Sequence, residues 1–184
     1  MRQIVSSLFI SLDGVVESPD QWQHDFDEEM GASLATTLET TDTVLLGRVT
    51  WTEWAGYWPS YDEGDEDSEF ARWINGSPKY VASTTLDSVA EWPNSFLLEA
   101  DLASAVKELK AAPGKGITVA GSPGLVVSLL DRGLLDELQL LIHPVIAGGG
   151  RRKLFADNSP LQNLELVDSS STSSGTIIAT YRPK

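Results

Sequence analysis

Three junctions in this sequence combine glycine, hydroxyl and basic residues in patterns that suit phosphate binding. The strongest runs from Val119 to Gly124 (VAGSPG), where an apolar strand passes directly into a turn and a helix. Gly121 permits close approach of the backbone, Ser122 supplies a hydroxyl and a helix N-cap, and Pro123 suits the first helical turn. Backbone amides at such a helix start can receive phosphate. A well-capped helix without a ligand is the alternative that this segment leaves open.

The other two junctions also follow predicted strands. Arg48 lies in the segment 46–51 (LGRVTW), where an arginine can pair bidentately with phosphate, or can balance nearby carboxylates at the surface. Ser83 and Thr84 belong to a hydroxyl cluster at 81–86 (VASTTL). Serine and threonine at such positions are more often turn residues than ligands.

Candidate proton donors are few. Asp13 is the best-placed carboxylate, because it follows the first predicted strand. With a raised pKa it could donate a proton or bind an amino-substituted ring, and the alternative is a simple turn with Gly14. His143, at a strand end, is expected to be a structural histidine with satisfied hydrogen bonds. His24 lies in a loop beside Trp22, and this loop is expected to line the mouth of a substrate site or to lie on the surface.

Aromatic and cationic clusters give two further candidates. Trp51, Trp54, Tyr57 and Trp58 offer rings that can stack on a planar heterocycle, and we expect one of them to contact a ligand while the others pack in the core. The run 151–153 (RRK) can hold phosphate, form a subunit contact or lie on open surface, and the sequence does not choose between these roles.

Charge and composition exclude several classes of function. The chain has 184 residues, with 13 basic and 27 acidic side chains and a formal net charge of -14. This balance argues against nucleic-acid and anionic-membrane partners. The sequence contains no cysteine, which excludes disulfides and thiolate chemistry, and its two histidines give no convincing metal site. It shows no signal peptide or membrane span, so a cytoplasmic location is expected.

Hydrophobic patterning predicts strands that alternate with helices. Strands are expected at residues 4–12, 43–46, 79–83, 96–98, 117–120 and 138–142, and helices at residues 25–40, 50–54, 102–110 and 125–132. Residues 57–69 are expected to form an acidic surface loop, and residues 161–168 and 176–181 a terminal hairpin. The fold class that follows is a single α/β domain, residues 1–184, with a mostly parallel twisted sheet, helices on both faces and a C-terminal antiparallel hairpin.

Six short motifs, taken in order, resemble those of the dihydrofolate-reductase-like superfamily. The nearest resemblance is to the reductase domain of the bifunctional riboflavin-biosynthesis deaminase-reductase, and it covers nearly the whole chain. The motifs are SLDG (11–14), LGRVTW (46–51), KYVASTTL (79–86), VAGS (119–122), GLLDEL (133–138) and HPVIAGGG (143–150).

The resemblance implies an NADPH-dependent reductase. It places Gly47, Arg48 and Thr50 at the cofactor's phosphates, and Ser83 and Thr84 near the adenosine 2'-phosphate. The helix start Gly121, Ser122, Pro123 and Gly124 is placed under the pyrophosphate. Asp13 and Gly14 are placed near the nicotinamide and substrate, with Trp22 expected at the substrate mouth. This sequence departs from its relatives at two positions. Many relatives carry arginine where this chain has Thr84, and the riboflavin reductase carries glutamate where this chain has Val119.

The implied substrate is a small heterocycle, in the manner of 5-amino-6-(5-phosphoribosylamino)uracil reduction. Relatives usually pair as homodimers, so a homodimer is expected here. Two alternatives remain open on the sequence. One is a nucleotide-binding module without reductase turnover, and the other is a pteridine or dihydrofolate reductase.

Overall fold

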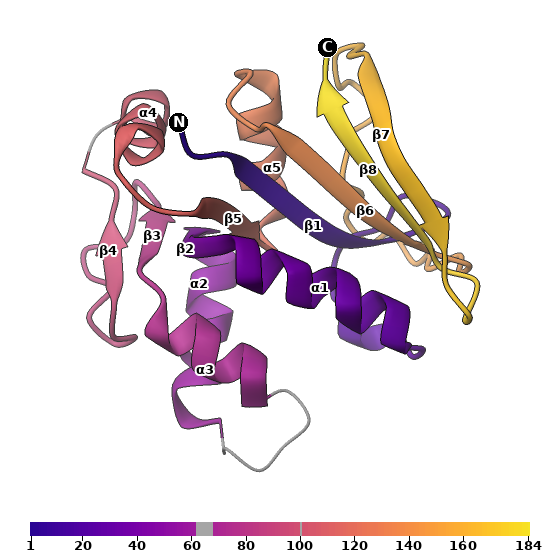
Figure 1. Cartoon of the computed structure of the whole chain (residues 1–184), viewed down its shortest axis with the longest axis horizontal. Helices are drawn as coiled ribbons and strands as arrows, with labels where there is room; N and C mark the ends of the chain where they lie inside the picture. The colour runs from indigo at the N-terminus through magenta and orange to yellow at the C-terminus, as the bar shows by residue number, and fades with distance from the viewer. Residues whose placement is uncertain (62–67, 100) are drawn as a thin grey trace.

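The computed structural model describes residues 1–61, 68–99 and 101–184, and within these residues eight strands form one sheet. The strands are β1 (Ile4–Ser11), β2 (Thr41–Gly47), β3 (Lys79–Ala82), β4 (Ser95–Leu97), β5 (Gly116–Ala120), β6 (Glu137–His143), β7 (Leu164–Ser171) and β8 (Ile177–Pro183). Their order across the sheet is β4-β3-β2-β5-β1-β6-β8-β7 (Figure 1). All pairs from β4 to β6 are parallel, and β8 and β7 close the sheet as an antiparallel hairpin.

Helices connect the strands and cover both faces of the sheet. They are α1 (Glu28–Thr40), α2 (Arg48–Ala55), α3 (Ser68–Gly76), α4 (Leu102–Ala111) and α5 (Pro123–Asp131), with short 3-10 helices η1 (Pro19–Gln21) and η2 (Trp58–Ser60). Figure 1 shows α1 in front of the sheet and α5 behind it. The predicted fold class is therefore confirmed.

Strand β2 is buried on both faces, as expected for the centre of a parallel sheet. Val44 and Leu46 pack in one core cluster with Trp51 of α2. Leu45 points the other way and packs with Leu129 of α5. Because successive side chains of a strand point to opposite faces of the sheet, the apolar residues of β2 are divided between two cores. Helices cover each core on the side away from the sheet.

Several predicted boundaries need correction. Helix α1 begins at Glu28 and not at residue 25, because the Asp27 carboxylate caps it by accepting a hydrogen bond from the Met30 amide at 3.0 Å. Helix α2 begins at Arg48, directly after β2, and α5 begins at Pro123. The end of the chain is the hairpin that was expected, shifted by up to three residues.

Helix α3 was not predicted: its first two residues fall in the segment 57–69 that was assigned to a loop, and the rest of the helix lies beyond that segment. Most of the predicted acidic surface run, residues 62–67, lies outside the described residues, whereas Glu69 belongs to the first turn of α3. The Lys79 side chain, fully buried, donates hydrogen bonds to the carbonyl oxygens of Ile74 and Ser77 at 2.9 Å each. Lys79 therefore fixes the end of α3 against the start of β3.

In the part of the chain that the structure describes, no helix is long and apolar enough to cross a membrane.

Candidate functional site

The predicted site residues follow the carboxyl ends of parallel strands, and these ends share one edge of the sheet. Asp13 follows β1, Arg48 follows β2, Ser83 follows β3 and Ser122 follows β5. Because β3, β2, β5 and β1 are neighbours in this order, the topology places these residues side by side. Ligands of open α/β sheets bind at such an edge.

Two of the junctions are joined directly by hydrogen bonds. The Gly47 amide donates to Ser122 Oγ at 2.9 Å, and the Ser122 amide donates to Thr50 Oγ1 at 3.0 Å. Both hydroxyl side chains are buried. The expectation that the Ser122 hydroxyl caps its own helix is therefore wrong, because it accepts from the Gly47 amide at the end of β2 and makes no cap hydrogen bond. Thr50 and Ser122 hold the two helix starts together.

Glycine is required at position 121 by both conformation and space. Gly121 has a φ of +52° and is followed by Ser122 with the same φ, so the turn runs through two left-handed residues. A Cβ on Gly121 would lie 3.1 Å from Thr50 Cγ2 and 3.8 Å from the Trp54 ring. This close approach keeps the turn backbone against α2, with Trp54 at its side.

Arg48 is the first residue of α2 and its side chain is exposed. Among the described residues its guanidinium has no hydrogen bond or ion-pair partner. Arg48 is thus a cation available to a ligand at the start of a helix, where anions are also favoured by the helix dipole.

The turn after β3 is closed by its own serine. Ser83 Oγ accepts hydrogen bonds from the amides of Thr85 at 3.1 Å and Leu86 at 3.0 Å, which is a common serine turn. Thr84 is exposed at the tip of this turn. Of the two residues, Thr84 has the side chain that is available to a ligand.

Asp13 is ionised, contrary to the expected raised pKa. Hydrogen bonds from Ser11 Oγ at 2.7 Å and from the Gly148 amide at 2.9 Å, with a further bond from the Ala147 amide at 3.0 Å, lower the Asp13 pKa to about 2. Donors that favour the charged form outweigh the opposing effect of burial. Asp13 therefore ties the loop after β1 to the loop after β6 and holds no proton at neutral pH.

Comparison with known proteins then identifies the family. Residues 2–178 match the RibD C-terminal domain family. The chain belongs to this family. The uncharacterized protein YyaP of Bacillus subtilis (strain 168) is 33% identical over 186 residues, covering 98% of this chain and 94% of that protein.

Two solved structures show the same fold. A putative riboflavin biosynthesis protein from Shewanella sp. PV-4 has a TM-score of 0.77 at 20% identity, covering 99% of each chain. A Thermotoga maritima diaminohydroxyphosphoribosylaminopyrimidine deaminase/5-amino-6-(5-phosphoribosylamino)uracil reductase has a TM-score of 0.68 at 15% identity, covering 100% of this chain and 57% of that one. The resemblance stated from the six motifs is confirmed, and this chain is related to reductase domains of riboflavin biosynthesis.

Within this RibD C-terminal domain, the loop after β1 packs closely on the loop after β6. The Leu154 amide donates to the Gly14 carbonyl at 2.9 Å, and Val15 forms a β-bridge with Lys153. Trp22 is buried, and its indole N–H donates to the Glu17 carbonyl at 2.9 Å. The expectation that Trp22 lies at an open substrate mouth is therefore wrong in this conformation, since its ring packs inside the molecule.

His143 is buried beside Trp22 and is only partly satisfied. Its ring lies 5.8 Å from the Trp22 ring and 5.5 Å from the Phe9 ring, between centroids. Nδ1 lies 3.3 Å from Thr176 Oγ1, whereas Nε2 has no partner among the described residues. Burial lowers the His143 pKa, which favours the neutral ring. The structural role is as expected, but the full set of hydrogen bonds is not. His24 is exposed.

The four rings of the aromatic cluster differ in burial, and the expectation that all but one pack in the core is wrong for Tyr57, which is exposed. Trp51 is buried, with its indole N–H donating to Ser95 Oγ at 3.1 Å. Trp54 is half-buried beside Gly121, and Tyr57 is exposed and packs on Trp58 with ring centroids 5.0 Å apart. Trp54 is therefore the indole nearest the candidate site.

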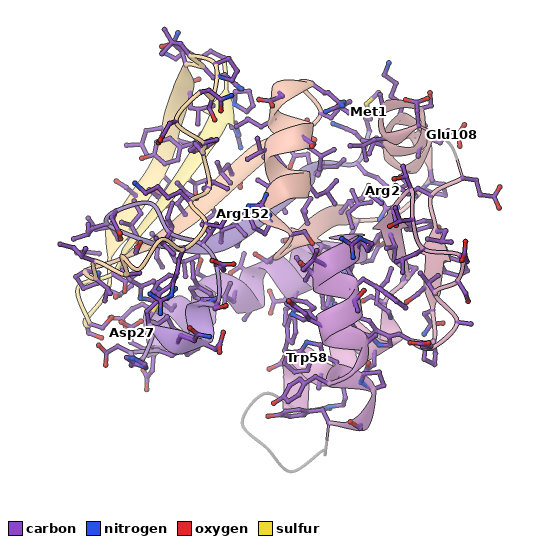
Figure 2. The ribbon with its side chains drawn as sticks, turned by 180° about the vertical axis from the view of Figure 1, so that it is seen from behind. Met1, Arg2, Asp27, Trp58, Glu108 and Arg152 are labelled. Atoms are coloured by element: carbon purple, nitrogen blue, oxygen red, sulfur yellow. The ribbon has the colours of Figure 1, made fainter. Side chains whose placement is uncertain are left out.

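Sequence reasoning left Arg152 unassigned, and the structure places it at the site. Figure 2 shows Arg152 beside the end of α5 at which the helix begins. The basic run 151–153 was the signal in the sequence, but its position depends on the path of the loop after β6. In the described parts of the chain, no three histidine, aspartate or glutamate side chains gather in a group that could hold a metal ion.

Proposed function

We propose that this protein is an NADPH-dependent reductase of a small heterocyclic substrate. The observation that carries the proposal is the pair of interlocked helix starts at the carboxyl edge, with an exposed cation, Arg48, at one of them. Membership of the RibD C-terminal domain family supports the same reading.

The chain's residues fit a dinucleotide laid across this edge. The helix starts at 47–48 and 121–124 are assigned to the phosphates, because their glycines leave the backbone approachable. The Gly47 and Ser122 amides are already bound to Ser122 Oγ and Thr50 Oγ1, so the assigned donors are the amides of Arg48 and Gly124 in the first helical turns. Arg48 supplies the charge for a phosphate, and the turn of Ser83 and Thr84 is assigned to the adenosine end. Thr50 acts indirectly, by holding Ser122.

The substrate is assigned to the loop after β1. A bound NADPH supplies a hydride, so the chain's task is to place the substrate and to exclude water. Asp13 Oδ2 can accept a hydrogen bond from a ring amino group, since it accepts only the Gly148 amide in the structure, whereas Oδ1 already accepts from Ser11 Oγ and the Ala147 amide. An aminouracil of the kind named for the Thermotoga relative has such groups, and it is our first candidate for the substrate.

A specific observation keeps a second candidate function in view. Asp13, the best-placed carboxylate for donating a proton, is ionised with a pKa of about 2. Reduction then has to take its proton from water or from the substrate itself. A nucleotide-binding module without turnover has no need of a proton donor.

Fluorescence titration with NADPH and NADH, followed by turnover assays, tests the proposal. The fluorescence of the half-buried Trp54 beside Gly121 is expected to be quenched when a dinucleotide binds. The assays then follow NADPH consumption with an aminopyrimidine and with dihydrofolate. Absence of binding by either dinucleotide would refute the proposal, binding without consumption would favour the module, and turnover of dihydrofolate alone would indicate a folate reductase.

We also propose that the chain acts as a homodimer that pairs through the β8–β7 end of the sheet. Strand β7 is the edge strand there, and Leu166 and Ile177 leave 52% and 45% of their surfaces exposed. Residues 93–184 carry nine basic and nine acidic side chains, whereas residues 1–92 carry the whole net charge of -14. A second copy of the chain is therefore repelled least by this end.

A further inference from the structure

The Arg152 side chain lies against the first turn of α5 at Gly124, where no side chain separates it from the helix backbone. A Cβ on Gly124 would lie 2.8 Å from Arg152 Nη2 and 3.7 Å from both Cζ and Nη1. The guanidinium therefore rests on the Gly124 backbone. Alanine at position 124 would displace it.

Two loops fix the backbone of Arg152 in this place. The Arg152 carbonyl accepts a hydrogen bond from the Val16 amide at 3.1 Å, and the Arg152 amide donates to Glu17 Oε2 at 2.8 Å. The neighbouring Lys153 forms the β-bridge with Val15. Because both bonds use the main chain, the side chain is held at its base while its charged end has no protein partner among the described residues.

The charge of Arg152 is not neutralised locally. The nearest carboxylate in the hydrogen-bond network, Glu17, binds the Arg152 amide and forms no ion pair with the guanidinium. Arg152 and Gly124 line an open depression of about 440 Å3, together with Lys153, Asp157 and Ser159. Asp157 is thus the one carboxylate in the lining, against two cations. An unpaired cation is notable in a chain with a net charge of -14.

We propose that Arg152, resting on Gly124, binds the pyrophosphate of the dinucleotide. This inference rests on the proposed function. Helix α5 follows β5, which lies two strand positions from β3 and its Ser83–Thr84 turn, a separation of about 10 Å. A phosphate at Gly124 is thus well removed from the adenosine end assigned to that turn. A planar guanidinium suits a pyrophosphate because it can donate two parallel hydrogen bonds.

The first test compares Arg152→Gln with Arg132→Gln. Arg132 is the exposed arginine at the other end of the same helix, where its side chain donates to the Ser128 carbonyl. Arg152→Gln is expected to weaken binding of both NADPH and NADH by about tenfold, because both carry the pyrophosphate. Arg132→Gln should change neither by more than about twofold. Unchanged binding in Arg152→Gln, or loss of NADPH alone, overturns the assignment.

Gly124→Ala gives a second test that leaves the charge in place. The new Cβ meets the mobile end of the Arg152 side chain, and alanine is a better helix former than glycine, so the variant is expected to fold. Gly124→Ala should weaken the binding of both dinucleotides in the wild-type background. In the Arg152→Gln background it should cause little further loss of binding. Equal effects in the two backgrounds would show that Gly124 does not act through Arg152.

Inorganic pyrophosphate separates failure of this inference from failure of the proposed function. Arg152-dependent binding of pyrophosphate without binding of either dinucleotide would support the anion site and refute the reductase. Dinucleotide binding that is insensitive to Arg152→Gln would refute only the inference. If the wild type binds neither pyrophosphate nor a dinucleotide, both are wrong.

Discussion

Asp13 joins two loops that approach the carboxyl edge from β1 and β6. Its two oxygens accept the Ala147 and Gly148 amides, and Ser11 Oγ donates a third hydrogen bond. These donors stabilise the ionised form, so the carboxylate orders the edge and leaves proton transfer to other groups.

Asp13→Asn is expected to destabilise the protein at neutral pH, because the new amide group would face a backbone N–H. The folded pKa of about 2 lies below the ordinary value of 3.8, so the ionised carboxylate stabilises the fold above that value. This contribution is lost as pH falls through the folded pKa. Urea unfolding should therefore show a gap between wild type and variant that narrows from pH 7 to about pH 2.5.

Asp20→Asn, at an exposed position in η1, is the matched control and should change stability little at either pH. A gap of constant size across the acidic range would contradict the role assigned to the Asp13 charge.

If the Arg48 guanidinium contacts the 2'-phosphate, Arg48→Ala is expected to weaken the binding of NADPH by about tenfold and the binding of NADH by less than about twofold. The pattern differs from that of Arg152→Gln, which should weaken both. Parallel fluorescence titrations with the two dinucleotides measure it, with Arg132→Ala as the control. Equal losses would show that Arg48 does not touch the 2'-phosphate.

The residue types at the site could be predicted from the sequence, but the partners of their hydroxyl groups could not. Ser122 and Thr50 were identified as ligand candidates, and both turn out to bind backbone amides from another element. Such bonds join residues 72 to 75 positions apart in the chain, so only the packed strands reveal them. Arg152 was visible as part of a basic run, but its contact with Gly124 depends on the long loop after β6.

At the scale of elements, α3 depends on a side chain that lies outside it. Lys79 Nζ binds the carbonyls of Ile74 and Ser77 and lies 4.7 Å from the centroid of the Trp92 ring. Burial lowers the Lys79 pKa to about 8. Helix carbonyls that lack intrahelical partners are thus satisfied by a buried cation.

Lys79→Met should destabilise the protein by about 1–3 kcal/mol at neutral pH, because it leaves these carbonyls without a donor. The pH dependence has a defined sign. Between the folded pKa of about 8 and the ordinary 10.5 the unfolded chain binds more protons, so Lys79 makes stability rise with pH in this window. The difference in unfolding free energy between wild type and variant should therefore grow from pH 8 to pH 10.5.

Lys107→Met changes an exposed lysine on α4 and serves as the control, with little effect expected. A difference between wild type and Lys79→Met that falls over the same pH range would contradict the lowered pKa.

Strongly periodic or strongly apolar elements could be predicted, and α3 could not. The strands from β1 to β6 are apolar runs that end in turn residues, and Asp101 signals α4 by accepting the amides of Ala103 and Ser104. Helix α3 has nine residues, follows an acidic run and takes its stability from Lys79 and from packing of Ile74 in the core. Short helices held by tertiary contacts carry weak local signals.

At the scale of the whole molecule, charge and topology are correlated. Residues 1–92 carry four basic and eighteen acidic side chains, and they supply β1, β2 and β3 with α1, α2 and α3. The β6-β8-β7 end of the sheet belongs entirely to the electrically balanced half. The anionic dinucleotide of the proposed function would therefore meet a repulsive surrounding field at the carboxyl edge, and Arg48 and Arg152 are the residues proposed to supply the local attraction.

The same asymmetry predicts how two copies of the chain associate. Leu166 pairs with Tyr181, and Tyr181 pairs with Leu138, so these side chains share the face of the sheet that carries α5. Ile177 lies on that face too, opposite Ile142. Beyond α5 these apolar groups are partly exposed, and the edge strand β7 offers unpaired backbone groups to a second sheet.

Leu166→Lys is therefore expected to convert the dimer to a monomer, and sedimentation velocity at matched concentrations measures the change. Phe96→Lys is the matched control, because Phe96 is 50% exposed on β4, the opposite edge strand. It should leave the dimer intact.

Pairing through the electrically balanced end should also depend little on salt, whereas contact between two acidic halves would strengthen as salt screens their repulsion. A monomeric wild type would show that there is no such interface. Dissociation of the dimer by Phe96→Lys, or marked strengthening of association with salt, would show that the interface lies elsewhere.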